Sequence, residues 1–400
     1  MKLFRKIVEK STESVLFLSS TVTTVAVLFI VFFLFSEGLG IFKRSPVEGT
    51  YVIVVNSENQ VPELSAKQIK DVFNGDITNW ADIGGLEEDI YLFTLSEVGS
   101  MFTEEELGPE YEFMPSIIDS VINATPGVIG YFAQNNLPEN FHGKILPVAN
   151  ISLKEFFLGR EWYPTSAPAA LYGSLPLVLG TLWVSLGAIF LALPIGLITS
   201  VYMAEIANEK LRNMLKPLIE LLAGIPSVVY GFFGLVILVP FIQKVFNLPV
   251  GETALAGSII LAIMALPTIV TISEDAIRTT PVSLKEASLA LGASHWQTII
   301  RVILPYSRSG IIAASILGIG RAVGETMAVL MVTGKASVIP TSFLQPVRTI
   351  PATIAAELGE APYGGVHFKA LFTLGIILFL MTFIFNTLVE LAKARKKKSS

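Results

Sequence analysis

The sequence contains no cysteine, and only 15% of its 400 residues are charged. Without cysteine the chain can form no disulfide, no thiolate metal site and no thiol nucleophile. Its three histidines lie far apart in the sequence, so a histidine-rich metal site is not expected. Soluble domains carry about 25% charged residues, whereas this chain is 52% hydrophobic with a mean hydropathy of +0.64. The composition therefore excludes an ordinary water-soluble protein and indicates a membrane protein.

The hydrophobic residues gather in long runs rather than in a periodic pattern. A hydrocarbon core of about 30 Å needs about 20 apolar residues in a helix. The sequence thus predicts six membrane spans, at about 14–35, 174–201, 218–246, 253–273, 307–333 and 370–391. The first run follows a basic N-terminus, as in a signal peptide, but it exceeds the roughly 7–15 residues of a cleavable core. We expect it to be a retained anchor.

The basic residues predict the orientation, because cytoplasmic loops of membrane proteins are enriched in Lys and Arg. The N-terminus, the loops after the second and fourth predicted spans, and the C-terminal run at 393–398 are all basic. Both termini are therefore expected in the cytoplasm, with the protein in the plasma (inner) membrane.

The loop between the first two spans has a different character. From Lys43 to Tyr172 it carries 7 Lys and Arg residues against 19 Asp and Glu residues. Tyr51–Val55 predicts a strand, residues 67–73 a helix, and Asn74-Gly75 a turn. We expect an extracytoplasmic α+β domain at 45–165, after residues 1–44 (N-terminus and first span) and before a helical membrane core at 166–400.

The loop between the fourth and fifth spans reads as two short helices around a glycine turn. Ser283 precedes Glu286 by three residues and Ser294 precedes Gln297 by three, which predicts two capping boxes. Gly292 would end the first helix, and Pro305 the second. Three interpretations are open: a solvated hairpin, a docking element for a cytoplasmic partner, or a DNA-binding helix-turn-helix. With a span on each side, the last could not easily enter a major groove, and no nucleic acid is expected as a partner.

This hairpin resembles the EAA signature of ABC-importer permeases. The residues that carry the resemblance are Glu286, Ala287, Gly292, Leu304 and Pro305. The family usually has Ala where Ser288 stands and Ile where Val302 stands. In that family the loop couples the permease to a cytoplasmic ATPase dimer, so the resemblance implies the same coupling role here.

Several further stretches are similar to the permeases of phosphate-specific ABC importers, the PstC family. They include LLAGIPSVVYG at 221–231, LPTIVTISEDA at 266–276, ILGIGRAVGETMAVLMVTG at 316–334 and TIPATIAAELGEA at 349–361. The resemblance covers about residues 150–391. It implies three protein partners: a PstA-like second permease, a PstB-like ATPase dimer and a PstS-like phosphate-binding protein. It also implies that phosphate is the substrate and that membrane lipid surrounds the subunit. The chain has no Walker A motif, so it is expected to be no enzyme and to bind no cofactor, with ATP held by the partner.

Two charged residues, Arg321 and Glu325, fall within the fifth predicted span. Ionisable groups in the bilayer are costly and mostly functional. Four residues apart on a helix they would share one face. We expect Arg321 to attract the anion, and Glu325 to hold the arginine in place and keep the empty site close to neutral. Breaks are expected at Gly224, Pro226 and Ser227 in the third span and at Pro267 in the fourth, lining the pathway. The alternatives are a structural ion pair and an ordinary packing kink.

The outer domain is similar to segments of periplasmic phosphate-binding proteins, at Leu64–Gly85 and Thr125–Asn136. It is long enough for only one of their two lobes. Where that family has an anion-gripping turn, this chain reads TLSEVGSMF at 94–102. The family's arginine is absent and acidic residues surround the stretch, so it would repel phosphate. We expect a degenerate lobe that docks the binding protein or regulates transport; a purely stabilising insertion is the alternative.

The sequence therefore predicts an all-α polytopic membrane protein of ABC-importer permease type, with six transmembrane helices and an inserted extracytoplasmic α+β domain. Its expected function is to form the translocation pathway of an ATP-driven phosphate importer. Two alternatives stay open: a permease for molybdate, tungstate or sulfate, and a membrane sensor with an extracytoplasmic ligand lobe.

Overall fold

The computed structural model describes residues 2–47 and 49–397, without the side chains of residues 2–9, 11, 388, 389 and 391–397. Most of the basic terminal side chains that predict the orientation lie outside those described. The chain forms two compact units, one comprising residues up to Gly173 with Ala361–Thr373, the other Ser174–Glu360 with the residues from Leu374 onward.

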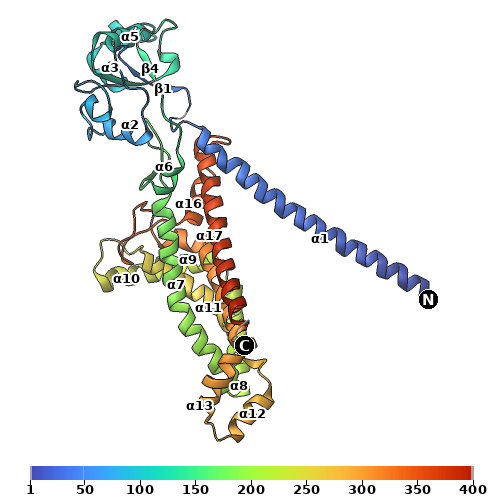
Figure 1. Cartoon of the computed structure of the whole chain (residues 1–400). Helices are drawn as coiled ribbons and strands as arrows, with labels where there is room; N and C mark the ends of the chain where they lie inside the picture. Colours follow the sequence, from blue (N-terminus) through green and yellow to red (C-terminus); the bar gives the residue numbers. More distant parts are fainter. Residues whose placement is uncertain (1, 48, 398–400) are drawn as a thin grey trace. The chain divides into compact units, whose positions relative to one another are not determined.

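The first unit begins with a long apolar helix, α1 (Lys2–Gly38), which continues into the short helix η1 (Leu39–Lys43). A four-stranded sheet follows, with strand order β2-β3-β1-β4 (Figure 1). Its strands are β1 (Tyr51–Val55), β2 (Tyr91–Phe93), β3 (Val128–Ala133) and β4 (Lys144–Leu146). Strand β1 is antiparallel to β3 and β4, and β2 is parallel to β3.

Both faces of this sheet are buried, because alternate side chains of a strand point to opposite faces. Ile53 and Val55 pack with Trp80 and helix α2 on one face, while Val54 packs with helix α5 on the other. The predicted strand, helix and turn are confirmed: α2 is capped by Ser65, and Gly75 adopts a φ of +79°. The helices and small strands of this domain are α2 (Ala66–Phe73), η2 (Trp80–Ile83), α3 (Leu95–Met101), α4 (Glu104–Leu107), α5 (Met114–Ala124), η3 (Gln134–Asn136), α6 (Leu153–Leu158), β5 (Trp162–Tyr163) and β6 (Leu171–Tyr172).

The second unit is helical. Its elements are α7 (Leu175–Val201), η4 (Tyr202–Ile206), α8 (Glu209–Gly224), α9 (Ser227–Phe233), η5 (Gly234–Leu238), α10 (Val239–Phe246), α11 (Ala254–Arg278), α12 (Val282–Ala290), α13 (His295–Thr298), η6 (Ile299–Ile303), α14 (Leu304–Gly324), α15 (Met327–Val332) and α16 (Ile350–Glu357). The last helix, α17 (Val366–Lys397), begins in the first unit and continues into the second.

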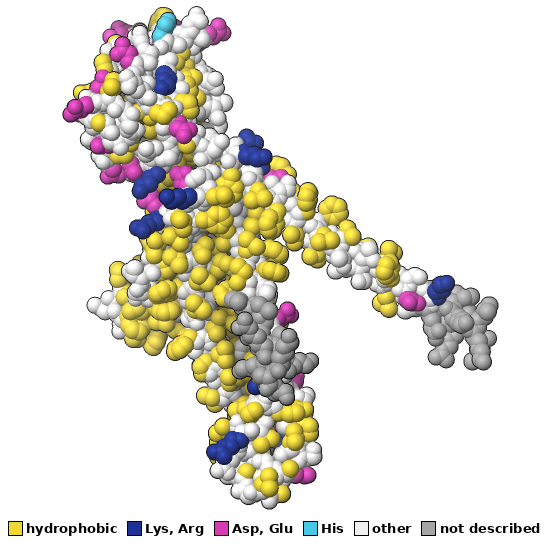
Figure 2. Space-filling model, viewed as in Figure 1, with side chains coloured by type: hydrophobic (Ala, Val, Ile, Leu, Met, Phe, Trp, Pro, Cys, Tyr) yellow, Lys and Arg dark blue, Asp and Glu magenta, His cyan; other side chains and the backbone are white. Residues whose placement is uncertain are grey.

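Among the residues that the structure describes, six helical stretches are long and apolar enough to cross a membrane, as predicted. They are Thr12–Lys43, Leu175–Ile206, Ser227–Phe246, Ala254–Arg278, His295–Gly324 and Val366–Thr387. The α+β domain follows the first stretch and precedes the second. Figure 2 shows hydrophobic side chains covering the helical unit, whereas acidic side chains are spread over the α+β domain.

Three predicted details of the spans are wrong. The third span begins at Ser227, because residues 218–224 belong to the separate charged helix α8. The fourth is unbroken, since Pro267 lies inside α11, where packed neighbours can compensate for the lost hydrogen bond. The fifth begins at His295 and passes through Pro305, because the wide-turn helix η6 precedes this proline and places it in the first turn of α14.

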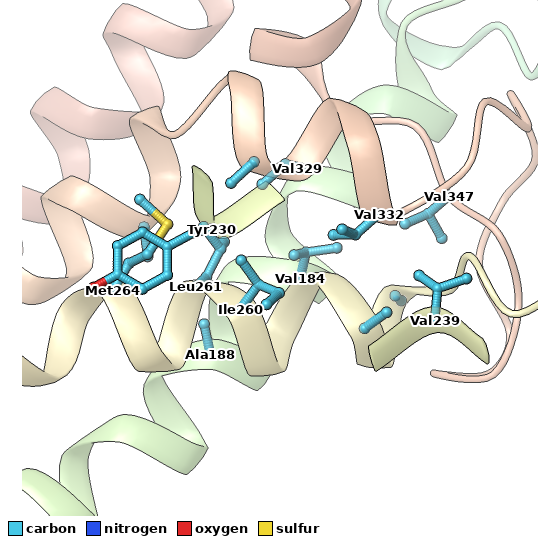
Figure 3. Close-up of a cluster of buried hydrophobic side chains, with 14 of the residues drawn as sticks. Val184, Ala188, Tyr230, Val239, Ile260, Leu261, Met264, Val329, Val332 and Val347 are labelled. Carbon is cyan, nitrogen blue, oxygen red and sulfur yellow. The ribbon is translucent and has the colours of Figure 1, made fainter. Parts of the chain in front are cut away.

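The core of the helical unit lies where α7, α11 and α15 meet. Small residues let these helices approach closely: an added Cβ on Gly257 of α11 would lie 2.4 Å from the Thr333 side chain. Val184, Ile260, Leu261 and Val329 are almost fully buried there (Figure 3). The packing of these side chains holds α7 and α11 side by side (Figure 1) and supports the elements that carry the candidate site.

Candidate translocation site and coupling hairpin

The break predicted at Gly224, Pro226 and Ser227 is present. Helix α8 ends at Gly224, Ile225 and Pro226 are extended, and α9 begins at Ser227. The Tyr230 hydroxyl donates a hydrogen bond of 2.7 Å to the Leu222 carbonyl, which also accepts one of 3.3 Å from the Ile225 nitrogen at the end of α8. The break therefore separates an amphipathic helix from a span rather than interrupting the span.

The prediction that Arg321 and Glu325 share one face of a helix is wrong. Helix α14 ends at Gly324, and Glu325 is extended (φ −71°, ψ 131°). Two residues later α15 begins, so Arg321 lies in the last turn of one helix and Glu325 in the break that separates this helix from the next. Among the described residues, no ion pair joins them. Both side chains are half-buried.

Glu325 faces the inside of the helical unit. It lines a narrow crevice with Thr181 and Ser185 of α7 and with Thr349 and Pro351 at the start of α16. One carboxylate oxygen lies 3.5 Å from the Ala328 backbone nitrogen. The Thr349 hydroxyl is buried and has no hydrogen-bond partner within the described structure. Polar groups from three helices thus meet at this crevice.

Arg321 occupies the last turn of α14, where the helix dipole favours a positive charge. Helix α9, which begins at the Gly224–Ser227 break, packs against α15, the helix that follows Arg321: an added Cβ on Gly231 would lie 2.9 Å from the Ala328 Cα. The structure therefore brings Arg321 close to the Gly224–Ser227 break, while Glu325 belongs to the crevice.

The glycines around Arg321 have different roles. An added Cβ on Gly318 would lie 2.8 Å from the Ile269 side chain, so this glycine allows α14 to pack against α11. Gly320 and Gly324 face open space instead. Close helix packing thus requires a glycine at Gly318 but not at Gly320 or Gly324.

The predicted coupling hairpin consists of α12, a turn at Gly292 with a φ of +83°, and α13. Ser294 and Gln297 form the predicted capping box. Ser283 forms none, because α12 begins one residue before it, after Pro281. Glu286, Ala287 and Gly292 are exposed, as a docking surface requires. Leu291, at the turn, is 89% exposed.

The other end of the hairpin is anchored in the helical unit. Leu304 is half-buried and packs against a cluster formed by Ile277 of α11 with Ile299 and Ile303 of η6. Pro305 follows in the first turn of α14 and is exposed. The hairpin is thus a direct extension of the fifth span.

Several polar residues of this region were not predicted. Glu274 on α11 is fully buried, 2.7 Å from the Arg212 guanidinium and 3.3 Å from the Lys216 ammonium. Glu205 at the end of the second span pairs with Lys285 of α12 at 2.6 Å. The sequence signal that could have found these pairs was the acidic residue that ends the second and the fourth predicted span, next to loops rich in basic residues.

In the α+β domain, the run at 94–102 forms helix α3 instead of an anion-gripping turn. The Glu97 carboxylate accepts hydrogen bonds from the backbone nitrogen and hydroxyl of Thr94 at the start of this helix. The Thr94 hydrogen bonds lower the pKa of Glu97, against a smaller opposing effect of burial. The start of helix α3 therefore carries a negative charge of the chain itself.

Family models divide the chain at one point. A model described as binding-protein-dependent transport system inner membrane component matches residues 173–398. The chain belongs to this family. A second model, described as PBP superfamily domain, matches residues 35–172. As such a permease the chain is a non-catalytic subunit of a multi-pass membrane ABC transporter, which requires an ATPase and a binding protein as partners.

Curated relatives of this family member include the probable ABC transporter permease protein YqgH of Bacillus subtilis. It is 41% identical over 250 residues, 62% of this chain and 81% of the relative. The phosphate transport system permease protein PstC of Mesorhizobium japonicum is 38% identical over 57% of this chain and 75% of its own. PstC of Xylella fastidiosa is 37% identical over 60% and 78%. A solved chain of the inward-facing MetNI methionine ABC transporter is 22% identical over 56% of this chain and 98% of its own, with a TM-score of 0.42.

Proposed function

We propose that this permease carries inorganic phosphate across the plasma membrane of a bacterium, as a subunit of an ATP-driven importer. The relatives named PstC support phosphate as the substrate. The single observation that carries the proposal is Arg321, a half-buried arginine without an ion-pair partner among the described residues. A guanidinium fork matches the geometry of a tetrahedral oxyanion.

The anion would pass Arg321 beside the Gly224–Ser227 break. Along α9 and η5 next to this break, a row of large hydrophobic residues is exposed, including Val229, Phe232 and Val236. A second, PstA-like permease would cover this face and complete the pathway. Because Glu325 lies in the helix break after Arg321 and lines the crevice, it would not neutralise the arginine when the site is empty.

The hairpin would dock a PstB-like ATPase dimer through Glu286, Ala287 and Gly292, and both termini would lie in the cytoplasm. The α+β domain would lie outside and contact a PstS-like binding protein. Its Glu97 supports a lobe that does not hold phosphate itself.

Labelled-phosphate uptake tests this function in cells that lack their own high-affinity importer and express the chain with its partners. We expect uptake that sulfate and molybdate do not displace and that Arg321→Gln abolishes, with Arg301→Gln, an exposed arginine of the hairpin region, as the control for expression and insertion. Displacement by another oxyanion would show that phosphate is the wrong cargo. Normal uptake by Arg321→Gln would assign Arg321 a structural role.

The role of the lobe is tested by phosphate titration of the full-length chain without its binding protein. We expect no saturable binding to the α+β domain. Tight binding that Glu97→Gln leaves intact would contradict the degenerate-lobe proposal.

A further inference from the structure

Helix α12 of the coupling hairpin has no buried residue. Packing against the hydrophobic core therefore contributes little to its position. One hydrogen bond, of 2.9 Å between the hydroxyls of Ser288 and Thr298, holds it to the second helix of the hairpin. What connects α12 to the membrane helices must be sought among its polar contacts.

The ammonium group of Lys285 lies 2.6 Å from a carboxylate oxygen of Glu205. Within the part of the chain that the structure describes, this ion pair joins α12 to the second span, whereas Ser288 bonds to Thr298 at the start of the fifth. The Glu205 side chain is only 7% exposed and that of Lys285 24%. Because solvent reaches the pair poorly, salt screens it less than it would an exposed pair.

Glu205 lies in η4, the wide-turn end of the second span, where the Ala207 nitrogen donates to the Tyr202 carbonyl at 2.8 Å. Such π-type turns occur frequently at functional sites. The preceding helix, α7, packs against α11 along the core of the helical unit (Figure 1). A displacement of Glu205 is therefore passed to a long, supported helix rather than to a loop.

The same helix carries Thr181 and Ser185, which line the crevice at Glu325. At about 1.5 Å per residue, Ser185 lies roughly 30 Å from Glu205 along the helix axis. The ion pair at one end of α7 and the crevice at the other are thus connected by one packed element.

We propose that the Lys285–Glu205 ion pair transmits movement of the coupling hairpin to α7, and through α7 to the crevice at Glu325. This inference rests on the proposed function, because it assigns the hairpin to an ATPase. Lys285 and Glu205 are positioning residues: they act through α7 and touch neither phosphate nor ATP. The EAA signature accounts for the contact between hairpin and ATPase, whereas this pair accounts for the next step inside the permease.

The test measures phosphate uptake and ATP hydrolysis together, with the complete importer reconstituted in proteoliposomes. Coupling free energies between sites correspond to about 5–150-fold changes, so in Lys285→Met and Glu205→Gln we expect phosphate moved per ATP to fall at least about fivefold, with hydrolysis retained. The exchanged pair Lys285→Glu with Glu205→Lys should recover most of the ratio. Lys210→Met, which alters an exposed lysine of neighbouring α8, is the matched control and should leave it unchanged.

A second arm uses the absence of cysteine from the chain. Cysteines replacing residues 205 and 285 should uncouple the importer, and joining them with a short bis-maleimide should restore coupling, because the hairpin and α7 would again move as one body. A wild-type ratio in both single variants overturns the proposal, and so does a cross-link that blocks uptake while hydrolysis continues. If the wild type moves another oxyanion instead of phosphate, the cargo proposal fails and the same ratio, measured with that anion, still decides on the pair.

Discussion

Glu274→Gln should release helix α8 from the membrane core. Helix α8 has no buried residue, so its position depends on a few polar contacts. Glu274 of α11 is fully buried and lies 2.7 Å from Arg212 and 3.3 Å from Lys216 of α8. Hydrogen bonds and charges of Asp275 and Glu274 raise the pKa of Lys216, although burial acts in the opposite direction. The Glu274 carboxylate therefore holds both Arg212 and Lys216 of α8.

The magnitude follows from the burial of each partner. Breaking a fully buried ion pair costs about 3–5 kcal/mol. Here the side chains of Arg212 and Lys216 are 21% and 26% exposed, so water can solvate the charges left behind. We therefore take a value below this range, about 2 kcal/mol, which corresponds to about 30-fold faster exchange of the protected amides.

Hydrogen exchange followed by mass spectrometry measures this effect directly in protein held in nanodiscs. The increase should be confined to α8 and the adjoining break, while the core of α7 and α11 stays protected. Glu209→Gln is the control, since Glu209 is exposed in the first turn of the same helix. Unchanged exchange of α8 in Glu274→Gln would refute the reasoning, and so would a similar increase in the control.

Two further predictions concern packing and pH. Gly318→Ala should lower the thermal unfolding midpoint of the purified protein, because the new Cβ would lie 2.8 Å from Ile269. Gly320→Ala meets no atom within 4 Å and should leave the midpoint unchanged or raise it. Equal midpoints for the two variants would contradict this prediction. In the α+β domain, burial would raise the pKa of Asp119, but hydrogen bonds from the ring and backbone of His142, with the charge of that ring, outweigh it, and the pKa is lowered. The stabilisation by Asp119 is thus present above its unfolded pKa of about 3.9 and is lost as pH falls through the lower folded value. Asp119→Asn should lower the unfolding free energy of the α+β domain by up to about 1 kcal/mol at pH 7 and by less near pH 3. Unfolding is followed by the fluorescence of Trp80 and Trp162 in a Trp183→Phe, Trp296→Phe background. A difference in unfolding free energy that does not depend on pH would contradict this prediction.

Most of the architecture could be predicted from the sequence, because the physical signals for it are local. An apolar run of span length is visible without knowledge of its neighbours, and six of them gave the membrane helices. Turn residues behaved similarly: Gly75 and Gly292 adopt the positive φ expected of them. The break after Gly224 was also predictable, since a glycine and a proline two residues apart disfavour a continuous helix.

The helix break that follows Arg321 was not predictable in the same way. Its residues, Gly324, Glu325 and Thr326, include no proline and form no recognised stop pattern, and apolar residues continue on both sides. What ends α14 here is tertiary: Ala322 and Val323 are buried on one side of the break and Ala328 and Val329 on the other, all in contact with the helical core or its crevice. Spacing alone placed both charges on one helix face, and only the packing of α15 as a separate helix overrode it.

The unpredicted ion pairs share one property, which is their separation along the chain. Glu205 and Lys285 lie 80 residues apart, and Arg212 and Glu274 lie 62 apart. The i, i+4 spacing rule applies within one helix and cannot predict such pairs. Each acidic residue nevertheless ends an apolar run, where burying a carboxylate without a partner would be costly. An acidic residue at the end of a span is therefore a reason to search the basic loops on the same side of the membrane for its partner. For this chain, that search restricts Glu205 and Glu274 to the basic residues of α8 and the hairpin region, which are the elements in which their partners lie.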